Sequence, residues 1–373
     1  MTARTFTTLL IVVSLALSAY HWATAPSLSW AFKVENPPLD SAPPRFATVF
    51  DYRSEAGSAH APAIRLGETG FSLIWFDGTR ESHEDVVIRR ADFSQADGRW
   101  NASDPQVYLQ KETMSAATVP RQVILSLGNT IQLGEQATAD LATVVSFGGW
   151  AAASVALVET GFDGLPALAR KLHLSPMLNR SHLVRAPTVP YADGTDAIPA
   201  YFELGNAFGE LVRLDASGRV RDKQRISQGR LAIQPVIVPF DRQNAVALMR
   251  NFDRASDRLV ASWTDDGGQS WSATELLDLP NPNAPVAALR LSDGQVLMAF
   301  NNSPADASIL ALALSDDRGR SWRVIETLEQ GGGQARYPAI ARLAGGDIVL
   351  TYSVDSKKGI RAHVFNEAWV ISR

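Results

Sequence analysis

A short segment that recurs six times along the chain limits what the chain can fold into. The copies begin near positions 62, 130, 187, 235, 285 and 338, so their spacings are 68, 57, 48, 50 and 53 residues. Each copy has a proline, an apolar strand, a turn and a second apolar strand, except that Thr130 replaces the proline in one copy. Repeats of this length are typical of propeller blades with about four strands. The sequence therefore predicts an all-β fold, a six-bladed β-propeller over residues 46–373.

Two copies of a turn motif support this fold. Residues 264–271 and 315–322 both follow the pattern Ser/Thr-x-Asp-x-Gly-x-Ser-Trp, and their aspartates lie 51 residues apart, about one repeat. An Asp carboxylate can accept backbone N–H groups in a tight turn while a glycine takes a positive φ. We interpret both motifs as structural turns between outer strands rather than as catalytic aspartates. Residues 97–100 carry a degenerate copy.

The repeat also predicts which residues meet. In a propeller the innermost strand of each blade lines a central funnel. The starts of the first strands therefore share one mouth: His60, Asn129, Arg185, Gln234, Asn283 and Tyr337. The loops after the second strands add a neighbouring ring: Asp77, Arg80, Glu81, Glu203, Arg250 and Asn301. Packing alone would favour small apolar residues at these positions, so their polarity indicates a functional surface. A glycine run at 331–333 predicts an adjustable loop beside this mouth.

Composition excludes several kinds of chemistry. The chain has no cysteine, so it can form no disulfide, thiolate metal site or cysteine nucleophile. A net charge of -4 offers no basic surface for a phosphate backbone, which argues against a nucleic-acid partner. The six histidines lack His-x-His or HExxH spacing, so we expect no bound metal and no cofactor.

Residues 1–25 differ from the rest of the chain. Arg4 precedes an apolar run from Phe6 to Tyr20, and an Ala-x-Ala triplet follows at 23–25. This pattern is typical of a signal peptide, and an uncleaved membrane anchor is the alternative. Residues 26–45 contain five prolines and are interpreted as a linker. We therefore expect an exported protein, periplasmic or attached to the inner membrane only through this first segment.

The Asp-box turns on a six-unit β repeat resemble those of the sialidase (neuraminidase) superfamily, and the chain is most similar to bacterial sialidase-like proteins of the BNR/Asp-box repeat family. The resemblance covers about residues 45–370 and includes HAPAIRL (60–66), WFDGTRESHEDVVI (75–88), QPVIVP (234–239) and RYPAI (336–340). It implies an exo-glycosidase with arginines that hold a sugar carboxylate and a general acid. It also implies a tyrosine nucleophile and a glutamate that deprotonates this tyrosine.

The resemblance assigns candidate roles motif by motif. Tyr337 in RYPAI lies at the nucleophile position. Arg250 lies at a carboxylate-binding position, where its planar guanidinium suits bidentate capture. Arg80 lies near the arginine that precedes the general acid. The acid then comes from one acidic run: Glu81, Glu84 or Asp85. Of these we prefer Glu81, because Asp85 lies at an expected strand start.

The chain departs from the family pattern at three places. His60-Ala61-Pro62 stands where the family has Arg-Ile/Val-Pro, and Gln234 stands where the family has its glutamate base. Asp306 lies where the third arginine is expected. Glu203 or His60 could replace the base. Three arginines could supply the missing charge: Arg180, Arg185 and Arg336. We expect several polar residues to bind substrate: Arg250, Arg80, Gln234, Arg185 and Asn129.

These observations leave three functions open. The first is a sialidase-like exo-glycoside hydrolase acting on acidic sugars of surface or extracellular glycans, with Tyr337 as nucleophile and Glu81 as acid. The second is a polysaccharide lyase on uronic-acid glycans, in which Tyr337, His60 and Arg250 would act together. The third is a glycan-binding propeller without catalytic activity, which Gln234 favours. The expected partner in each case is an acidic oligo- or polysaccharide, and the sequence does not indicate the oligomeric state.

Overall fold

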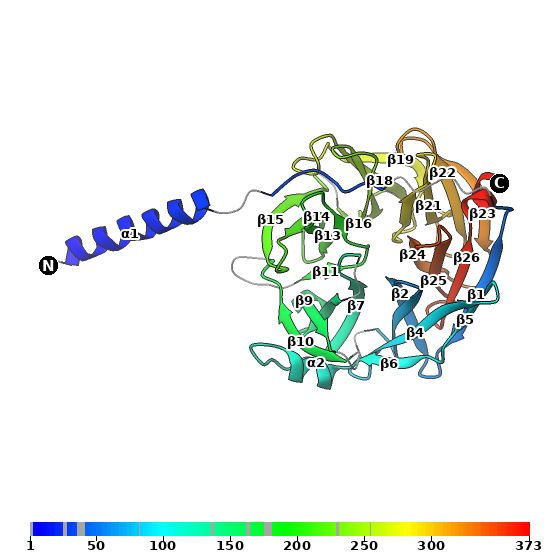
Figure 1. Ribbon diagram of the computed structural model, residues 1–373, viewed down its shortest axis with the longest axis horizontal. Coiled ribbons are helices and arrows are strands. Elements are labelled where there is room, and N and C mark those ends of the chain that lie inside the picture. Colours follow the sequence, from blue (N-terminus) through cyan, green and yellow to red (C-terminus); the bar gives the residue numbers. More distant parts are fainter. Residues whose placement is uncertain are drawn as a thin grey trace.

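The computed structural model describes residues 3–24, 28–35, 42–81, 83–135, 138–161, 165–174, 181–228, 231–253 and 255–373. Within these ranges the protein is mostly β, as the sequence predicts. Figure 1 shows the strands grouped around a common centre, with helix α1 (Ala3–Thr24) extending away from them. The described strands form five hydrogen-bonded sheets.

Two of these sheets come from the first part of the β region. The first contains β2 (Ser58–Leu66), β3 (Gly70–Gly78), β4 (Val87–Ala96), β5 (Arg99–Ala102) and β6 (Gln106–Leu109). The second contains β7 (Ser126–Gln132), β8 (Ala139–Val145), β9 (Ala153–Thr160) and β10 (Pro166–Lys171). Helix α2 (Lys111–Ala117) connects them, and a short 3₁₀ helix, Gly149–Ala152, precedes β9.

The largest sheet has nine described strands in two antiparallel groups. The first group contains β11 (His182–Val184), β12 (Val189–Pro190), β13 (Asp196–Phe202), β14 (Phe208–Leu214) and β15 (Val220–Arg225). The second contains β16 (Ala232–Pro239), β17 (Ala245–Asn251), β18 (Arg258–Thr264) and β19 (Glu275–Pro280). A single parallel pair, Phe208 with Ala232, joins the two groups.

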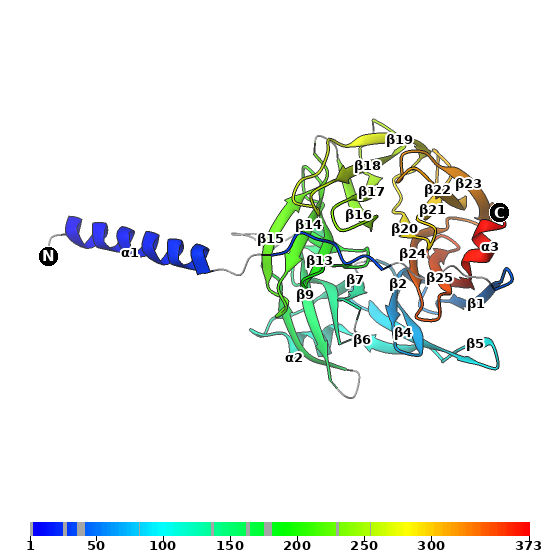
Figure 2. The ribbon, with the colours of Figure 1, turned by 45° about the horizontal axis from the view of Figure 1, so that its top comes forward.

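Two further sheets complete the β region. One contains β20 (Ala287–Arg290), β21 (Val296–Asn301), β22 (Leu310–Ser315) and β23 (Arg323–Glu329). The other contains β24 (Arg336–Arg342), β25 (Ile348–Val354), β26 (Gly359–Phe365) and β1 (Phe46–Arg53). Helix α3 (Glu367–Ile371) follows, at the C-terminal end of the chain (Figure 2).

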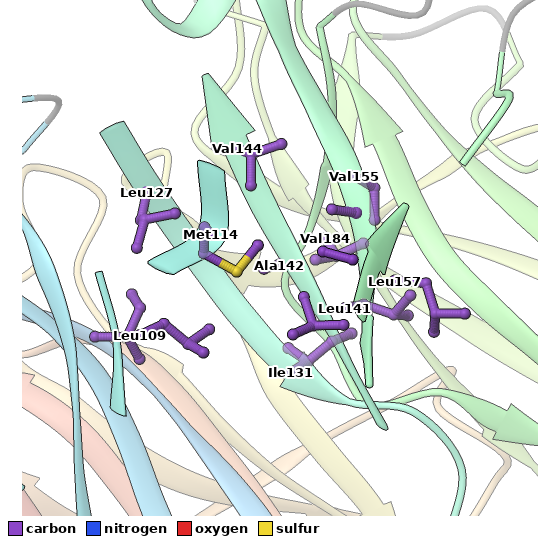
Figure 3. Close-up of a cluster of buried hydrophobic side chains, with 14 of the residues drawn as sticks. Leu109, Met114, Leu127, Ile131, Leu141, Ala142, Val144, Val155, Leu157 and Val184 are labelled. Carbon is purple, nitrogen blue, oxygen red and sulfur yellow. The ribbon is translucent and has the colours of Figure 1, made fainter. Parts of the chain in front are cut away.

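Apolar side chains hold neighbouring sheets face to face. Strands such as β8 are buried along almost their whole length, because both faces of a middle strand are covered by other sheets. Figure 3 shows one resulting cluster, in which Leu109 of β6 and Val184 of β11 lie with Leu141 of β8 between the sheets. Burial of such side chains contributes about 1.5–3 kcal/mol each relative to exposure, so these contacts hold neighbouring sheets together.

The last sheet joins the two ends of the β region, because β1 pairs antiparallel with β26. A chain of hydrogen-bonded polar side chains crosses this seam. The hydroxyl of Tyr352 donates to Glu329 Oε1 (2.8 Å) and lies 2.7 Å from His363 Nε2, while Thr48 Oγ1 lies 3.0 Å from His363 Nδ1. Because the Tyr352 hydroxyl donates its proton to Glu329, His363 Nε2–H must donate to the Tyr352 oxygen. His363 Nδ1 then accepts from the Thr48 hydroxyl, as it does in a neutral imidazole. Burial, with the charge of Arg361 in addition, lowers the pKa of His363 to about 4.

Part of the range predicted as a linker packs against the sheets. Residues 28–35 cross the end of the nine-stranded sheet, where Phe32 is fully buried and forms a bridge with Tyr191. The guanidinium of Arg213 lies 4.8 Å from the Trp30 ring and 3.4 Å from the Tyr191 ring. Aromatic faces attract a guanidinium that has been taken out of water, so this segment is anchored by both burial and charge.

Helix α1 is separate from these sheets in both views (Figures 1 and 2). Its apolar side chains, including Leu9, Leu15 and Leu17, are exposed. Among the described residues, no helix is both long enough and apolar enough to cross a membrane. The predicted roles of this segment as a signal peptide or an anchor remain predictions.

Both Asp-box turns have structural roles. Asp317 accepts hydrogen bonds from the backbone N–H groups of Arg320 (3.0 Å) and Ser321 (2.8 Å). Burial alone would raise the pKa of Asp317, but hydrogen bonds from Ser321 and its neighbours lower it to about 2. In the other turn, a Cβ on Gly267 would lie 1.9 Å from the carbonyl oxygen of Trp30, so only glycine fits there.

We predict that His363 makes the stability of the fold dependent on pH. Its pKa is about 4 in the folded chain and about 6.5 when unfolded, so the unfolded chain binds the proton more readily. The free energy of unfolding should therefore fall by up to about 3 kcal/mol between pH 6.5 and pH 4 on account of this residue. Chemical denaturation of the wild type and of His363→Gln should show a flatter profile for the variant. His173→Gln, at an exposed position, is the control and should keep the wild-type slope; equal slopes in all three proteins would contradict the prediction.

Candidate active site

Irregularities recur in four strands that carry candidate site residues. The pairing register shifts at matching places: between His60 and Ala63, Leu127 and Thr130, Ile233 and Val236, and Arg336 and Ala339. Such bulges bend a strand and redirect its side chains. Within them Ala61, Gln234 and Tyr337 take left-handed φ values of 51°, 54° and 57°, which is costly for residues other than glycine. The recurring sequence position is therefore a recurring bulge.

Tyr337 lies at the centre of the candidate site. Its hydroxyl accepts a hydrogen bond from Arg250 Nη1 at 3.3 Å. The ring of His60 packs edge-on against it, with centroids 4.1 Å apart. The guanidinium groups of Arg185 and Arg336 lie 5.5 and 5.9 Å from the centroid of its ring. The structure thus brings together five residues that the sequence analysis named.

Two amide side chains hold Arg250 in place. Its Nε donates to Asn283 Oδ1 at 2.6 Å, and its Nη1 donates to Gln234 Oε1 at 3.2 Å. Gln234 is itself oriented by Tyr201, because its Nε2 lies 3.1 Å from the Tyr201 hydroxyl. Gln234 cannot take up a proton, so at this position it aligns the guanidinium with the Tyr337 oxygen.

Positive charge is concentrated around the same phenol. Arg336 Nη2 donates to the carbonyl oxygen of Asn283 at 2.6 Å. Because the side chain of Asn283 accepts from Arg250, Asn283 connects the two arginines. Burial lowers the pKa of Arg336, and the nearby charge of Arg250 lowers it further although Tyr337 opposes this. Arg185 is buried, and burial lowers its pKa to about 10. Its Nη2 donates to the carbonyl oxygens of Tyr337 (2.6 Å) and Pro338 (2.9 Å). Such a cluster favours an anionic ligand.

His60 is buried against the ring of Tyr337. Its Nδ1 lies 3.0 Å from Ser353 Oγ, and its Nε2 is buried without a hydrogen-bond partner among the described residues. Burial lowers the pKa of His60 well below its usual range, and the positive charges of Lys357 and Arg185 act in the same direction. The imidazole is therefore neutral near pH 7, and taking up a proton there is unfavourable.

The two glutamates named from the sequence have different surroundings. Glu203 follows β13 and is half-buried, and burial raises its pKa although the charge of Arg250 opposes this. Glu81 is exposed, and its Oε2 accepts from Lys357 Nζ at 2.9 Å. The raised pKa of Glu203 suits a group that exchanges a proton near neutral pH.

The remaining acidic candidates lie in other contacts. Asp85 accepts from the Thr79 hydroxyl (2.6 Å) and the Thr79 N–H (3.0 Å), and these bonds, led by that of the hydroxyl, lower its pKa to about 2. Glu84 extends toward Lys111, at 3.8 Å. With so low a pKa, Asp85 is ionised near neutral pH and does not suit proton donation. Glu81 therefore stays our prediction within the acidic run.

Other predicted residues are exposed or half-buried, or are used in structural bonds. Arg80 is exposed after β3, and Asn129 is half-buried at the bulge of β7. Asp77 is buried and accepts from Tyr52 Oη at 2.7 Å. Asn301 is fully buried, and its amide donates to the carbonyl oxygen of Ala335 at 2.8 Å, among other carbonyls. Arg180 lies outside the described residues.

Sequence reasoning missed three residues of this site. Tyr201 orients Gln234, Ser353 bonds His60, and Lys357 pairs with Glu81. Tyr201 could have been considered, because it lies near the end of the strand that leads to Glu203. Nothing in the local sequence marks Lys357. Within the described part of the chain, no group of three His, Asp or Glu residues could hold a metal ion.

Comparison with known proteins gives one family match. The model of a family described as a BNR repeat-like domain matches residues 70–350. No curated protein sequence matches the chain.

Several solved structures are similar in fold. The Hadza microbial sialidase Hz136 aligns with a TM-score of 0.63 and 11% identity, covering 82% of this chain and 65% of that one. Trypanosoma rangeli sialidase gives 0.63 and 9%, covering 86% and 56%. The NanB sialidase from Streptococcus pneumoniae gives 0.63 and 12%, covering 88% and 71%. The chain thus spans less than two thirds of the first and second of these proteins, and at such low identity the likeness concerns the fold.

We predict that Arg250 is the main contact for an acidic ligand. Arg250→Lys keeps a positive charge but loses the planar guanidinium group that Asn283 and Gln234 hold in place. The affinity for sialyllactose should therefore fall about 10- to 100-fold. Isothermal titration calorimetry measures this change. Arg318→Lys, in an exposed Asp-box turn, is the matched control and should bind as the wild type does. Equal affinity in both variants would contradict the assignment.

Proposed function

This chain belongs to the family of BNR repeat-like domains, and we propose that it is a sialidase-like exo-glycoside hydrolase that acts on acidic sugars of surface or extracellular glycans. The observation that carries the proposal is the Tyr337 hydroxyl bonded to Arg250 at 3.3 Å, with two more guanidinium groups within 6 Å of its ring. A neutral phenol can approach a carbon beside a carboxylate, whereas an anionic nucleophile would be repelled.

The proposal includes a six-bladed propeller over residues 46–373. The five sheets support it, because the nine-stranded sheet consists of two antiparallel groups that share only one residue pair. The sixth group would take its outermost strand, β1, from the start of the β region. Six blades would place the bulged inner strands around one funnel, where Tyr337 lies.

The proposed reaction takes place in two steps. The Tyr337 oxygen attacks the anomeric carbon while the bond from this carbon to the leaving oxygen breaks, and Glu81 supplies the proton that the leaving oxygen takes up. Glu203, as carboxylate, accepts the phenol proton. Water then attacks the same carbon and releases Tyr337, with the proton movements reversed. Arg250 holds the substrate carboxylate throughout.

Glu203 is the proposed base rather than His60 for an electrostatic reason. Burial and nearby positive charges keep His60 neutral and oppose its protonation. Burial instead raises the pKa of Glu203, so this carboxyl group holds a proton more readily once it has received one. The same argument disfavours the lyase alternative, in which His60 would have to act as an acid.

One observation favours a second candidate function. Gln234 occupies the position at which the resembling family has its glutamate base, and its amide is engaged with both Arg250 and Tyr201. A site arranged in this way could bind an acidic glycan without cleaving it. Export is part of either proposal, supported by Arg4 and the exposed apolar residues of α1.

We predict that the full-length protein releases the fluorophore from a 4-methylumbelliferyl sialoside or a related keto-acid glycoside. Tyr337→Phe should reduce turnover at least 1,000-fold, since the covalent step loses its nucleophile. Tyr52→Phe removes a hydroxyl bonded to Asp77 in a different part of the chain and is the matched control.

Each other outcome of this assay has a defined meaning. Full turnover by Tyr337→Phe would exclude this residue as nucleophile. A rise in ultraviolet absorbance on uronic-acid polysaccharides would indicate the lyase. Glycan binding without turnover of any acidic glycoside would establish the binding function and reject hydrolysis.

A further inference from the structure

The turn between β25 and β26 has an unusual backbone. Asp355, Ser356 and Lys357 take φ values of 50°, 56° and 75°, so three consecutive residues other than glycine are left-handed. The left-handed conformation is unfavourable for L-residues because Cβ approaches the next carbonyl oxygen, and it normally occurs one residue at a time. Such strain persists only where surrounding contacts enforce it, and it is concentrated at functional sites.

Contacts on both sides hold this turn in place. Ser356 exchanges two hydrogen bonds with Gln334: its N–H donates to the Gln334 carbonyl (3.0 Å), and its Oγ accepts from the Gln334 N–H (3.1 Å). Asp355 accepts from Arg53, and the Lys357 carbonyl accepts from the Ala59 N–H at 2.8 Å. The turn is therefore tied to the segment that leads to Tyr337 and to the strand that carries His60.

This conformation places the Lys357 ammonium at the candidate mouth. Lys357 Nζ lies 2.9 Å from Glu81 Oε2, and both side chains are about one-third exposed, at 34% and 38%. Glu81 also interacts electrostatically with Arg336, and Lys357 is the charged group with the largest effect on the pKa of His60 after burial. Lys357 thus lies near both the proposed acid and the residues around Tyr337.

We propose that Lys357 is a specificity residue that leaves Glu81 and pairs with an anionic group of the substrate, a carboxylate on the sugar that enters the site. This inference rests on the proposed function, because it assigns the counter-ion of the proposed acid. A carboxylate paired with an ammonium does not donate a proton. Transfer of Lys357 to the substrate would free Glu81 to carry one, so only an acidic glycan would prepare the site for cleavage.

The partial exposure of this pair supports an exchange. A buried ion pair loses much free energy when one partner leaves, whereas an exposed pair is weak and its groups remain hydrated. The substrate carboxylate would lie among Lys357, Arg250 and Arg336. The positive charges of Arg250 and Arg336 already repel one another. An anion placed among these three cations relieves that repulsion, which binding of a neutral glycan does not.

The test compares Lys357→Met with the wild type on an acidic ligand and its neutral counterpart. Isothermal titration calorimetry of the full chain uses sialyllactose and sialyllactose methyl ester, with Tyr337→Phe introduced into every protein compared, so that no hydrolysis adds its own heat to that of binding. We expect the wild-type preference for the acid to fall about tenfold in Lys357→Met. Lys357→Arg should retain most of the preference, since its charge is kept. Thermal unfolding of each variant shows whether it is folded.

Lys358→Met is the matched control, because Lys358 is the next residue and is exposed. It should keep the wild-type preference. An unchanged preference in a folded Lys357→Met would overturn the proposal, as would an equal loss in Lys358→Met. If no acidic glycoside is cleaved but the preference still depends on Lys357, hydrolysis is rejected while the binding role of Lys357 stands. Where cleavage is observed, the proposal also requires the preference of kcat/KM for the acidic over the neutral glycoside to fall in Lys357→Met, because Glu81 is then free with either substrate.

Discussion

The site depends on an arrangement that is unfavourable by itself, in which three guanidinium groups surround one phenol. Arg250 bonds the Tyr337 hydroxyl, Arg336 lies beside it, and Arg185 is buried beneath the ring with backbone carbonyls as its acceptors. Bringing like charges together in a partly buried site costs free energy, which the packed sheets around it must offset. An anionic ligand would remove much of this cost, so the same feature that strains the free protein selects what it binds.

The backbone that holds these groups is also strained. The bulges in β2, β16 and β24 put Ala61, Gln234 and Tyr337 into left-handed conformations, and the turn at 355–357 does so for three residues in succession. Interdigitated apolar clusters between the sheets, such as that in Figure 3, keep these conformations from relaxing. The packing between the sheets and the chemistry of the candidate site are therefore linked through the bulges.

Much of this organisation was predictable, because segments with the same sequence pattern adopt the same strand and turn geometry. The spacing of the six segments predicts the strands, and it identified Tyr337, Arg250, Gln234 and Asn283 as neighbours. The sequence did not reveal the roles of Lys357 and Tyr201, because their positions depend on a backbone turn and on side-chain orientation rather than on spacing. The docking of residues 28–35 was missed for a similar reason: a Pro-rich composition predicts a linker, but Phe32 and Trp30 supply enough burial to anchor it.

The central claim is that Tyr337 is a nucleophile whose approach to the substrate is directed by Arg250. Mass spectrometry of the protein after incubation with a fluorinated sialosyl fluoride tests it most directly, because fluorine beside the anomeric carbon slows the second step and lets a covalent adduct accumulate. The account predicts one added glycosyl group, on the peptide that contains Tyr337. An adduct on Glu81 or Glu203, or turnover of an acidic glycoside with no adduct on Tyr337, would contradict it.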